Sequence, residues 1–172
     1  WLAQQLLERL GALRIRSDVE RKRLCGLPAL ARSDSAVGDG IYDTAATTAT
    51  YDRLVELAGD ILAAGYPVLV DAASLKVWQR AAFRDLAAAR GVPFVILDCT
   101  APEAVLRSRL ASRQAAGGDA SEADQAVLAY QMRAREVITP DEEACTLRID
   151  TSVPFPEDLP AALLDGQLAR VR

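Results

Sequence analysis

Apolar positions along the chain follow two periods, one typical of helices and one typical of buried strands. Leucines at positions 2, 6, 7 and 10 keep the helical spacing, and Gly11 ends that helix. Short apolar runs predict strands at 12–16, 67–71, 93–98 and 144–149. The runs at 67–71 and 93–98 are continuous, as in parallel strands that are buried on both faces. Helical patterns occupy about 17–24, 44–64, 76–90, 102–114 and 121–133.

Strands that alternate with helices indicate an α/β fold built on a parallel sheet. The 172 residues show no internal repeat or linker, which predicts one domain over 1–172. Ser17-x-x-Glu20 and Asp119-x-x-Glu122 both match the capping-box pattern at a helix start. The turn-rich segment 26–40 is expected to be mobile, and three prolines at 154–160 mark a loop before a short terminal helix.

Composition narrows the class of protein. A hydrophobic fraction of 51% with 26% charged residues is typical of a globular chain. No apolar run approaches the roughly 20 residues that span a bilayer, and no secretory leader is found, so a cytoplasmic location is expected. Cys25, Cys99 and Cys145 are widely spaced and odd in number, which predicts reduced and mostly buried thiols.

The chain has no histidine, which removes Ser-His-Asp and Cys-His nucleophiles and most zinc chemistry. Any general acid or base in this chain must therefore be a carboxylate. The net charge of −4 argues against a general nucleic-acid binder. Nearly all the positive charge is arginine, which suits bidentate phosphate contacts but is also common in proteins from GC-rich genomes.

Three acids follow three separate predicted strands: Asp18, Asp71 and Asp150. Ligands of open α/β sheets bind at the carboxyl ends of the strands, so these acids are expected to share one rim. The alternative is that each acid caps the turn or helix that follows. For Asp18 that alternative is weaker, because Ser17 already matches the cap position.

Arginines supply the candidate anion contacts. Arg21 lies one helical turn after Asp18, although runs such as 21–23 are usually solvated. Arg109 and Arg113 share a helix face before Gly117-Gly118 and could reach one anion from a glycine-hinged lid. For Arg107 we favour a surface pair with Glu103.

Four blocks of the chain together resemble one family. They are Arg16-Ser17-Asp18-Val19-Glu20-Arg21-Lys22-Arg23, the stretch 65–72, the stretch 91–97, and Arg113-Gln114 with Asp119-Ala120-Ser121-Glu122-Ala123. The chain from residue 2 to about 151 resembles P-loop kinases known as AAA-family ATP-binding proteins. In some bacteria these are fused behind an aminoglycoside-phosphotransferase-like domain. More distantly, the chain is similar to polynucleotide kinase, gluconate kinase and chloramphenicol phosphotransferase.

The resemblance implies a role for each candidate residue. Asp18 would be the base for the substrate hydroxyl, and Arg21 would hold the substrate or its phosphate. Asp71 would order Mg²⁺ through water, and Arg113, with Arg109, would contact the transferring phosphate. Asp150 and Thr151 would lie near the adenine. ATP and Mg²⁺ would be the cofactors, and a small molecule the phosphate acceptor.

The family's phosphate loop, G-x-x-x-x-G-K-[ST], is not found in these residues. The resemblance places that loop, and the central strand before it, ahead of Trp1, so we expect upstream residues and weak ATP binding by this chain alone. A non-catalytic regulatory or interaction domain with a degenerate nucleotide site is the alternative. A 5′-hydroxyl nucleic-acid kinase would share the Asp18–Arg21 spacing, but the net negative charge of the chain argues against this function.

Overall fold

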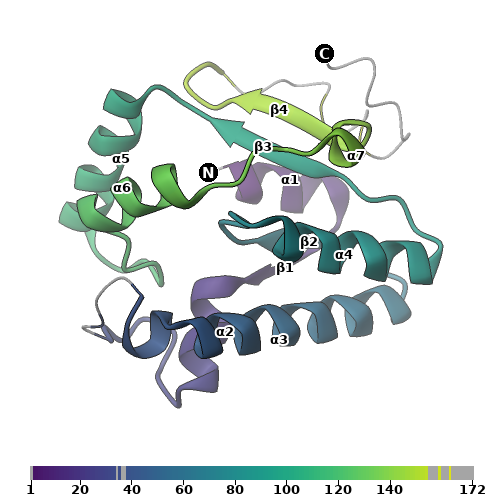
Figure 1. The fold of residues 1–172 in the computed structure, drawn as a ribbon, viewed down its shortest axis with the longest axis horizontal. Coiled ribbons are helices and arrows are strands. Elements are labelled where there is room, and N and C mark those ends of the chain that lie inside the picture. The colour runs from purple at the N-terminus through teal and green to yellow at the C-terminus, as the bar shows by residue number, and fades with distance from the viewer. Residues whose placement is uncertain (1, 34, 36–37, 155–158, 160–162, 164–172) are drawn as a thin grey trace.

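The computed structural model describes residues 2–33, 35, 38–154, 159 and 163, and these form an α/β fold (Figure 1). The elements, in chain order, are α1 (Leu2–Leu10), β1 (Leu13–Arg16), α2 (Ser17–Leu24), the 3-10 helix η1 (Gly40–Tyr42), α3 (Thr44–Ala63), β2 (Val68–Asp71), α4 (Val77–Arg90), β3 (Ile96–Thr100), α5 (Glu103–Ala116), α6 (Gln125–Ala134), α7 (Pro140–Glu143) and β4 (Thr146–Asp150). The predicted α/β class is confirmed. Of the terminal helix expected after Pro160, only Leu163 is among the described residues.

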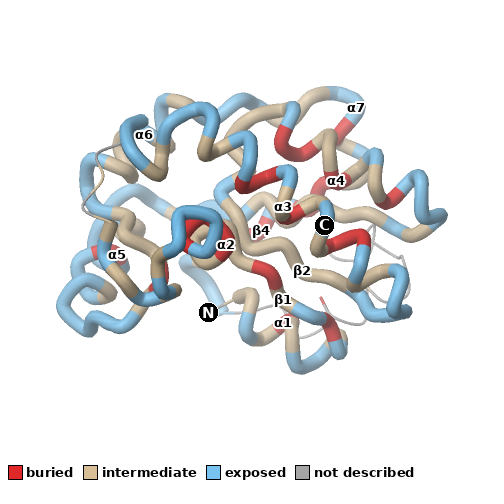
Figure 2. The backbone as a smooth tube through the Cα atoms, turned by 90° about the horizontal axis from the view of Figure 1, so that it is seen from below, coloured by how far each residue is buried: buried red, intermediate tan, exposed pale blue. Residues whose placement is uncertain are grey.

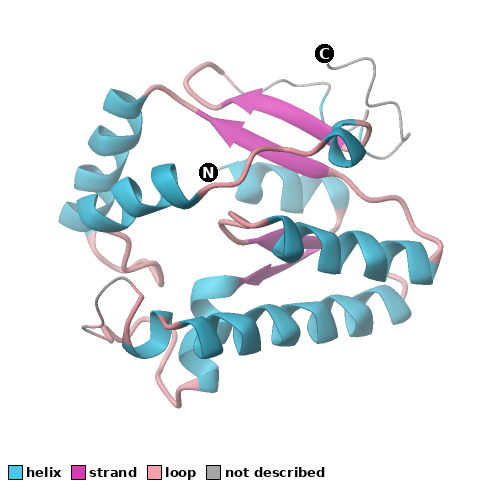
Figure 3. Cartoon of the chain, in the orientation of Figure 1, coloured by secondary structure: helices cyan, strands magenta, loops and turns pink. Residues whose placement is uncertain are grey.

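The strands form two parallel pairs rather than one sheet. In the first pair Leu13 of β1 is in register with Val68 of β2, and Arg16 with Asp71. In the second pair Ile96 of β3 is in register with Thr146 of β4. Within the described residues β2 and β3 do not pair with each other, although they are the inner strands of the two pairs (Figure 3).

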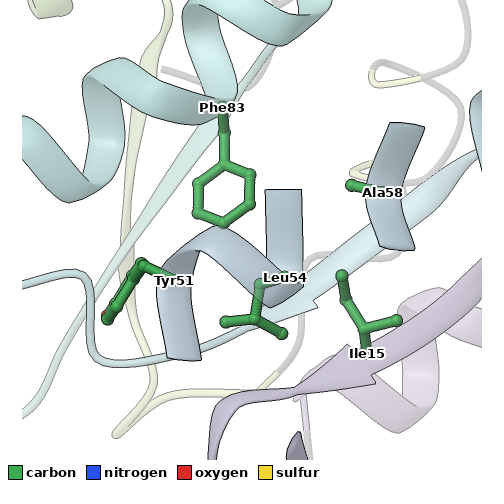
Figure 4. Close-up of a cluster of buried hydrophobic side chains, with 5 residues drawn as sticks. All are labelled: Ile15, Tyr51, Leu54, Ala58 and Phe83. Atoms are coloured by element: carbon green, nitrogen blue, oxygen red, sulfur yellow. The ribbon is translucent and has the colours of Figure 1, made fainter. Parts of the chain in front are cut away.

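Helices cover the first strand pair on one side and join both pairs on the other. Ile15 of β1 packs with Tyr51, Leu54 and Ala58 of α3 and with Phe83 of α4 (Figure 4). A second cluster centres on Leu6 of α1 and contains side chains from both pairs. Its other members on helix α1 and on the strands include Leu2, Leu10, Leu69, Leu97, Leu147 and Ile149. Helix α1 therefore supplies apolar surface to both strand pairs.

A connecting segment also ties the two pairs together. The chain between α6 and α7 passes across β3 in Figure 1. Its Arg135 donates to both carboxylate oxygens of Asp98 in β3, at 2.6 and 2.7 Å. The next residue, Glu136, donates its backbone N–H to the carbonyl of Leu75, just after β2. Contacts outside the strand ladders thus hold β2 and β3 in place.

Strands β2 and β3 are less buried than their apolar runs predicted. All four residues of β2 are half-buried, and the last two residues of β3 are exposed. Strand β4, in contrast, buries three of its five residues. The physical reason is that, in the part of the chain that the structure describes, β2 and β3 each have a partner strand on one edge only, which leaves backbone and side chains uncovered on the other.

Neither predicted capping box forms, although α2 begins at Ser17 as predicted. Helix α2 has Arg16 rather than Ser17 at its N-cap, with no side-chain cap bond, and Glu20 pairs instead with Arg23 at 2.6 Å. The helix predicted from residue 121 begins at Gln125, where Asp124 accepts a cap bond from Val127. Residues 119–122 do not start that helix because their polar groups bond to another part of the molecule, described below.

Some predictions of burial also fail. In α4, Phe83 is buried in the core, whereas Trp78 is 45% exposed. Arg21 and Lys22 are 7% and 1% exposed, so only Arg23 of the basic run at 21–23 is solvated. The three cysteines are free thiols, but Cys25 and Cys99 are exposed and Cys145 is half-buried.

Helices α5 and α6 stand apart from the buried parts of the molecule. Leu110 is the one buried residue of α5, and no residue of α6 among those described is buried (Figure 2). The surface pair predicted between Arg107 and Glu103 is confirmed at 2.6 Å. None of the described helices combines the length and apolarity that crossing a membrane requires.

Candidate functional site

Two of the three predicted rim acids lie together. Arg16, at the end of β1, is in register with Asp71, at the end of β2, and Asp18 follows two residues after Arg16. The carboxylates of Asp18 and Asp71 interact electrostatically. Asp150 ends β4, in the other strand pair. There it accepts bonds from the backbone N–H and the hydroxyl of Ser152, at 2.8 and 2.6 Å, as an acid that caps a turn does.

Asp18 sits at the start of α2 in a half-buried position. Burial raises the pKa of its carboxyl group, because a desolvated carboxylate is less stable than one in water. A hydrogen bond from the Ser121 hydroxyl and the charges of Arg16 and Arg21 oppose that rise. The group is therefore a carboxylate in a low-dielectric setting with basic partners, which suits a proton acceptor.

Arg21 is buried but incompletely satisfied. Its Nη1 donates to the carbonyl of Ile41 at 2.9 Å and to Thr47 Oγ1 at 3.2 Å, and its guanidinium lies 5.1 Å from the ring centre of Tyr42. Its Nε is buried without a hydrogen-bond partner among the described residues. A buried cation with an orphaned donor keeps unused hydrogen-bonding capacity.

Asp71 is held by two arginines that the sequence analysis did not single out. Arg14 Nε donates to Asp71 Oδ2 at 3.1 Å, a second bond comes from Arg14 Nη2, and Arg16 Nε lies 3.5 Å from the same oxygen. The alternation Leu-Arg-Ile-Arg in β1 could have predicted these contacts, because it places both arginines on one face of the strand.

The two predicted lid arginines contact different groups. Arg109 Nη1 donates to Thr151 Oγ1 at 2.9 Å, and its Nη2 donates to the Thr151 carbonyl at 2.5 Å. Arg113 is half-buried, and its charge acts on Asp119. Arg109 therefore contacts the loop after β4. Arg113 instead acts on Asp119, which follows Gly117-Gly118.

A cavity of about 650 Å³ adjoins Arg109 and Thr151. Its wall also includes Leu2, at the start of α1, and Cys99, near the end of β3. It thus brings together residues of α1, β3 and α5 and the loop after β4. The arginine in its wall suits the phosphates of a nucleotide.

Residues 119–122 form a further part of the site, which we call the clamp. Asp119 Oδ1 accepts from Arg16 Nη2 at 2.7 Å, and the carbonyl of Ala120 accepts from Lys22 Nζ at 2.8 Å. Glu122 Oε1 lies 3.0 Å from Lys22 Nζ. The prediction of a simple capping box missed this role. The sequence feature that could have predicted the clamp is the opposite charge of two blocks, the acidic residues at 119–122 and the basic residues about a hundred positions earlier.

The described residues include no group of three or more acids, cysteines or histidines that could enclose a metal ion. Mg²⁺ in nucleotide sites does not need such a group, because it keeps several waters and takes one or two carboxylates plus substrate phosphates. Asp71, at the end of β2, is a carboxylate of that kind. The residues present therefore fit Mg²⁺ held through water.

Comparison with known proteins places the chain in a family. Residues 1–138 match the family model AAA_33, described as an AAA domain. Over 128 residues the chain is 29% identical to the uncharacterized proteins Rv2004c of Mycobacterium tuberculosis and Mb2027c of Mycobacterium bovis. That match covers 74% of this chain and 26% of each relative, so the chain spans about a quarter of their length.

Solved structures show the same fold. A sugar kinase from Janibacter sp. HTCC2649 superposes with a TM-score of 0.61 and 19% identity, over 98% of this chain and 84% of the kinase. A gluconokinase from Sinorhizobium meliloti 1021 gives a TM-score of 0.53 and 22% identity, over 98% of this chain and 83% of that protein. The chain belongs to the AAA domain family AAA_33, and its fold is that of P-loop kinases.

Proposed function

We propose that the protein is an ATP-dependent phosphotransferase that acts on a hydroxyl group of a small molecule. The observation that carries this proposal is the pairing of a half-buried acid, Asp18, with the buried and incompletely bonded Arg21 at a strand end. Phosphoryl transfer requires mainly positioning and charge neutralisation, and a base that takes the hydroxyl proton.

In this proposal each side chain has one task. The substrate oxygen forms a bond to the γ-phosphorus, the bond between that phosphorus and the bridging oxygen breaks, and ADP leaves. Asp18 accepts the hydroxyl proton, and Arg21 binds an oxygen of the substrate through its free Nε. Arg113 and Arg109 neutralise phosphate charge from α5. Mg²⁺, held by Asp71 through water, would neutralise charge on the phosphates of ATP.

We also propose that a further strand, carried by a segment outside these residues, lies between β2 and β3 and leads into the phosphate loop. The inner edges of β2 and β3 are unpaired in the described residues, and α1 packs against both strand pairs. A parallel strand there would satisfy both edges. It would end beside Asp71 and the N-terminus of α1, where backbone N–H groups favour a bound phosphate.

The acceptor is proposed to be a polyhydroxylated small molecule. Two of the solved proteins that share the fold are described as a sugar kinase and a gluconokinase. Arg21 adds a reason to include acidic sugars, because its free donor can bind a carboxylate. The length of the mycobacterial relatives leaves room for another domain. An aminoglycoside-phosphotransferase-like domain is the one we propose, as a fusion partner.

The proposal is tested with Asp18→Asn in the full-length protein. Transfer of labelled phosphate from ATP to a panel of sugars, sugar acids and aminocyclitols is measured, with nucleotide affinity measured by calorimetry. The variant is expected to lose transfer and to keep its ATP affinity. Equal loss of both would assign Asp18 a structural role. Transfer to a 5′-hydroxyl oligonucleotide would favour the nucleic-acid kinase, and full-length protein without ATP affinity would favour the non-catalytic domain.

A further inference from the structure

The arginines that hold Asp71 share one of its two carboxylate oxygens. Asp71 Oδ2 accepts from Arg14 Nε at 3.1 Å and from Arg14 Nη2, and Arg16 Nε lies 3.5 Å from the same atom. None of these three contacts involves Oδ1. The Asp71 side chain is 37% exposed, which is more than either arginine. The carboxylate is therefore accessible to solvent although two cations lie against it.

Regular strand pairing builds this arrangement. Arg16 is in register with Asp71, and Arg14 is in register with Leu69, two residues before Asp71. Residues two apart in a strand lie on the same face, so both arginine side chains lie on the face of the strand pair that carries the Asp71 carboxylate. Contacts between regular elements hold their geometry better than contacts between loops. Both cations are thus fixed features of the site.

The chain of opposite charges continues from Asp71 to the clamp. Arg16 Nη2 donates to Asp119 Oδ1 at 2.7 Å, so Arg16 joins Asp71 to Asp119. Burial lowers the pKa of Arg16, but the bond to Asp119 and the charges of Asp119, Asp71 and Asp18 raise it overall. Arg16 is therefore a cation at every pH at which the protein works, and the charges of Asp71 and Asp119 are compensated by arginine.

We propose that Arg14 and Arg16 prevent Asp71 from binding a free divalent cation, so that Mg²⁺ enters the site together with ATP. This inference rests on the proposed function, in which Asp71 holds Mg²⁺ through water. A free cation beside Oδ1 would lie near two guanidinium groups, and like charges repel strongly where water screens them only in part. The phosphates of ATP bring negative charge that offsets this repulsion, and they supply further oxygen ligands.

The neighbouring acids do not cancel the effect of the arginines. Asp18 acts on Asp71 electrostatically, but the charges of Arg16 and Arg21 act on Asp18 in turn. Asp119 is bonded to Arg16. The part of the chain that the structure describes offers no cluster of three or more acids, cysteines or histidines that could enclose an ion. A cation at Asp71 therefore depends on the ligands that a nucleotide brings.

Mn²⁺ binding by the full-length protein without nucleotide, measured by electron paramagnetic resonance, tests the proposal. Arg14→Gln removes the charge and keeps a side chain that can donate to Asp71. We expect this variant to bind free Mn²⁺ about tenfold more tightly than wild type. Arg14→Lys keeps the charge and should stay within about twofold of wild type. Arg148→Gln is the second control, because it breaks an exposed pair with Glu143 and should leave the affinity unchanged.

Two further variants locate the effect. Adding Asp71→Asn to Arg14→Gln should abolish the gain in Mn²⁺ affinity, because the carboxylate that binds the ion is gone. Arg16→Gln should also raise the affinity, and it provides the measurement if Arg14→Gln does not fold. An unchanged affinity in the variants that lose an arginine charge would overturn the proposal. So would a gain that persists without the Asp71 carboxylate, or an equal gain in Arg14→Lys.

The outcome is distinguishable from a failure of the proposed function. ATP should raise the Mn²⁺ affinity of wild type by a larger factor than that of Arg14→Gln, since the arginines make the ion depend on phosphates. If Arg14→Gln binds Mn²⁺ more tightly but the protein neither binds ATP nor transfers phosphate, the control of Asp71 by the arginines stands and the proposed function is rejected. Phosphate transfer by wild type with no gain in Arg14→Gln would have the opposite meaning.

Discussion

Arg80 and Glu142 form a buried ion pair that links the regions after β2 and before β4. Arg80 Nε lies 2.7 Å from Glu142 Oε1, and Arg80 Nη2 lies 2.9 Å from Glu142 Oε2. Both side chains are 5% exposed or less. Arg80 also donates to the carbonyls of Ser74 and Val137. This pair therefore helps to hold together two strand pairs that share no ladder in the described residues.

The first prediction concerns acid stability. The bonds from Arg80, and those from Thr139, outweigh burial and lower the pKa of Glu142 to about 2, from 4.5. A carboxyl group with a depressed pKa stabilises the fold fully above its unfolded pKa, and this contribution is lost as the pH falls toward the folded pKa. Glu142→Gln should therefore lower the free energy of unfolding at pH 7 by roughly 3 kcal/mol. The difference from wild type should shrink between pH 4.5 and about 2.

Urea unfolding at several pH values checks this prediction. Glu143→Gln is the control, because the neighbouring Glu143 pairs with Arg148 at the surface. That variant should stay near wild-type stability, since exposed pairs contribute little. A constant difference between Glu142→Gln and wild type down to pH 2 would contradict the depressed pKa.

The second prediction concerns the clamp. Lys22→Met leaves Glu122 as a half-buried carboxylate without its cation, and we expect a loss of about 3–5 kcal/mol in the free energy of unfolding. Adding Glu122→Leu should recover part of that loss, because the double variant has no unpaired charge. Arg53→Met, which breaks an exposed pair with Glu56, is the control and should be nearly neutral. Equal losses of unfolding free energy in Lys22→Met and Arg53→Met would show that the buried pair contributes no more to stability than the exposed pair.

The third prediction concerns nucleotide binding in the full-length protein. Arg109→Ala removes both bonds to Thr151 and the cation at the 650 Å³ cavity. ATP affinity should fall about tenfold, as for the loss of one charged contact. Arg107→Ala, two residues earlier on α5, breaks only surface contacts and should leave the affinity unchanged. Calorimetric titration measures both, and indistinguishable affinities would remove Arg109 from the nucleotide site.

The fourth prediction concerns Mg²⁺. If Asp71 holds the ion through water, Asp71→Ala should bring the ratio of ATP dissociation constants without and with Mg²⁺ close to one. ATP affinity measured without Mg²⁺ should not weaken, because Asp71 carries negative charge like the phosphates. An Mg²⁺ titration of the variant that matches wild type would place the ion elsewhere.

Local pattern predicted most of the elements and the proximity of two acids of the site. The apolar runs at 67–71 and 12–16 predicted strands, and parallel strands bring their carboxyl ends to one edge. Asp18 and Asp71 therefore come together as expected, as the register of Arg16 with Asp71 shows. The spacing of Asp18 and Arg21 likewise follows from one turn of a helix.

The clamp could not be predicted in this way. Asp119 and Glu122 fit a capping box as written, and nothing within a few residues distinguishes a cap from a long-range contact. Their partners Arg16 and Lys22 lie about a hundred residues earlier, and the path of α5 and α6 decides whether they meet. Burial of β2 and β3 was overestimated for a similar reason, because it depends on the strand at their other edge.

The sequence by itself determined the class of fold, the order of the elements and the acids at the strand ends, because periodicity and strand polarity are local properties. Only the tertiary structure decided that Lys22 is buried against Glu122, that Asp119 pairs with Arg16 and that Arg109 contacts Thr151. Those contacts join segments far apart along the chain, and their geometry depends on how whole helices pack.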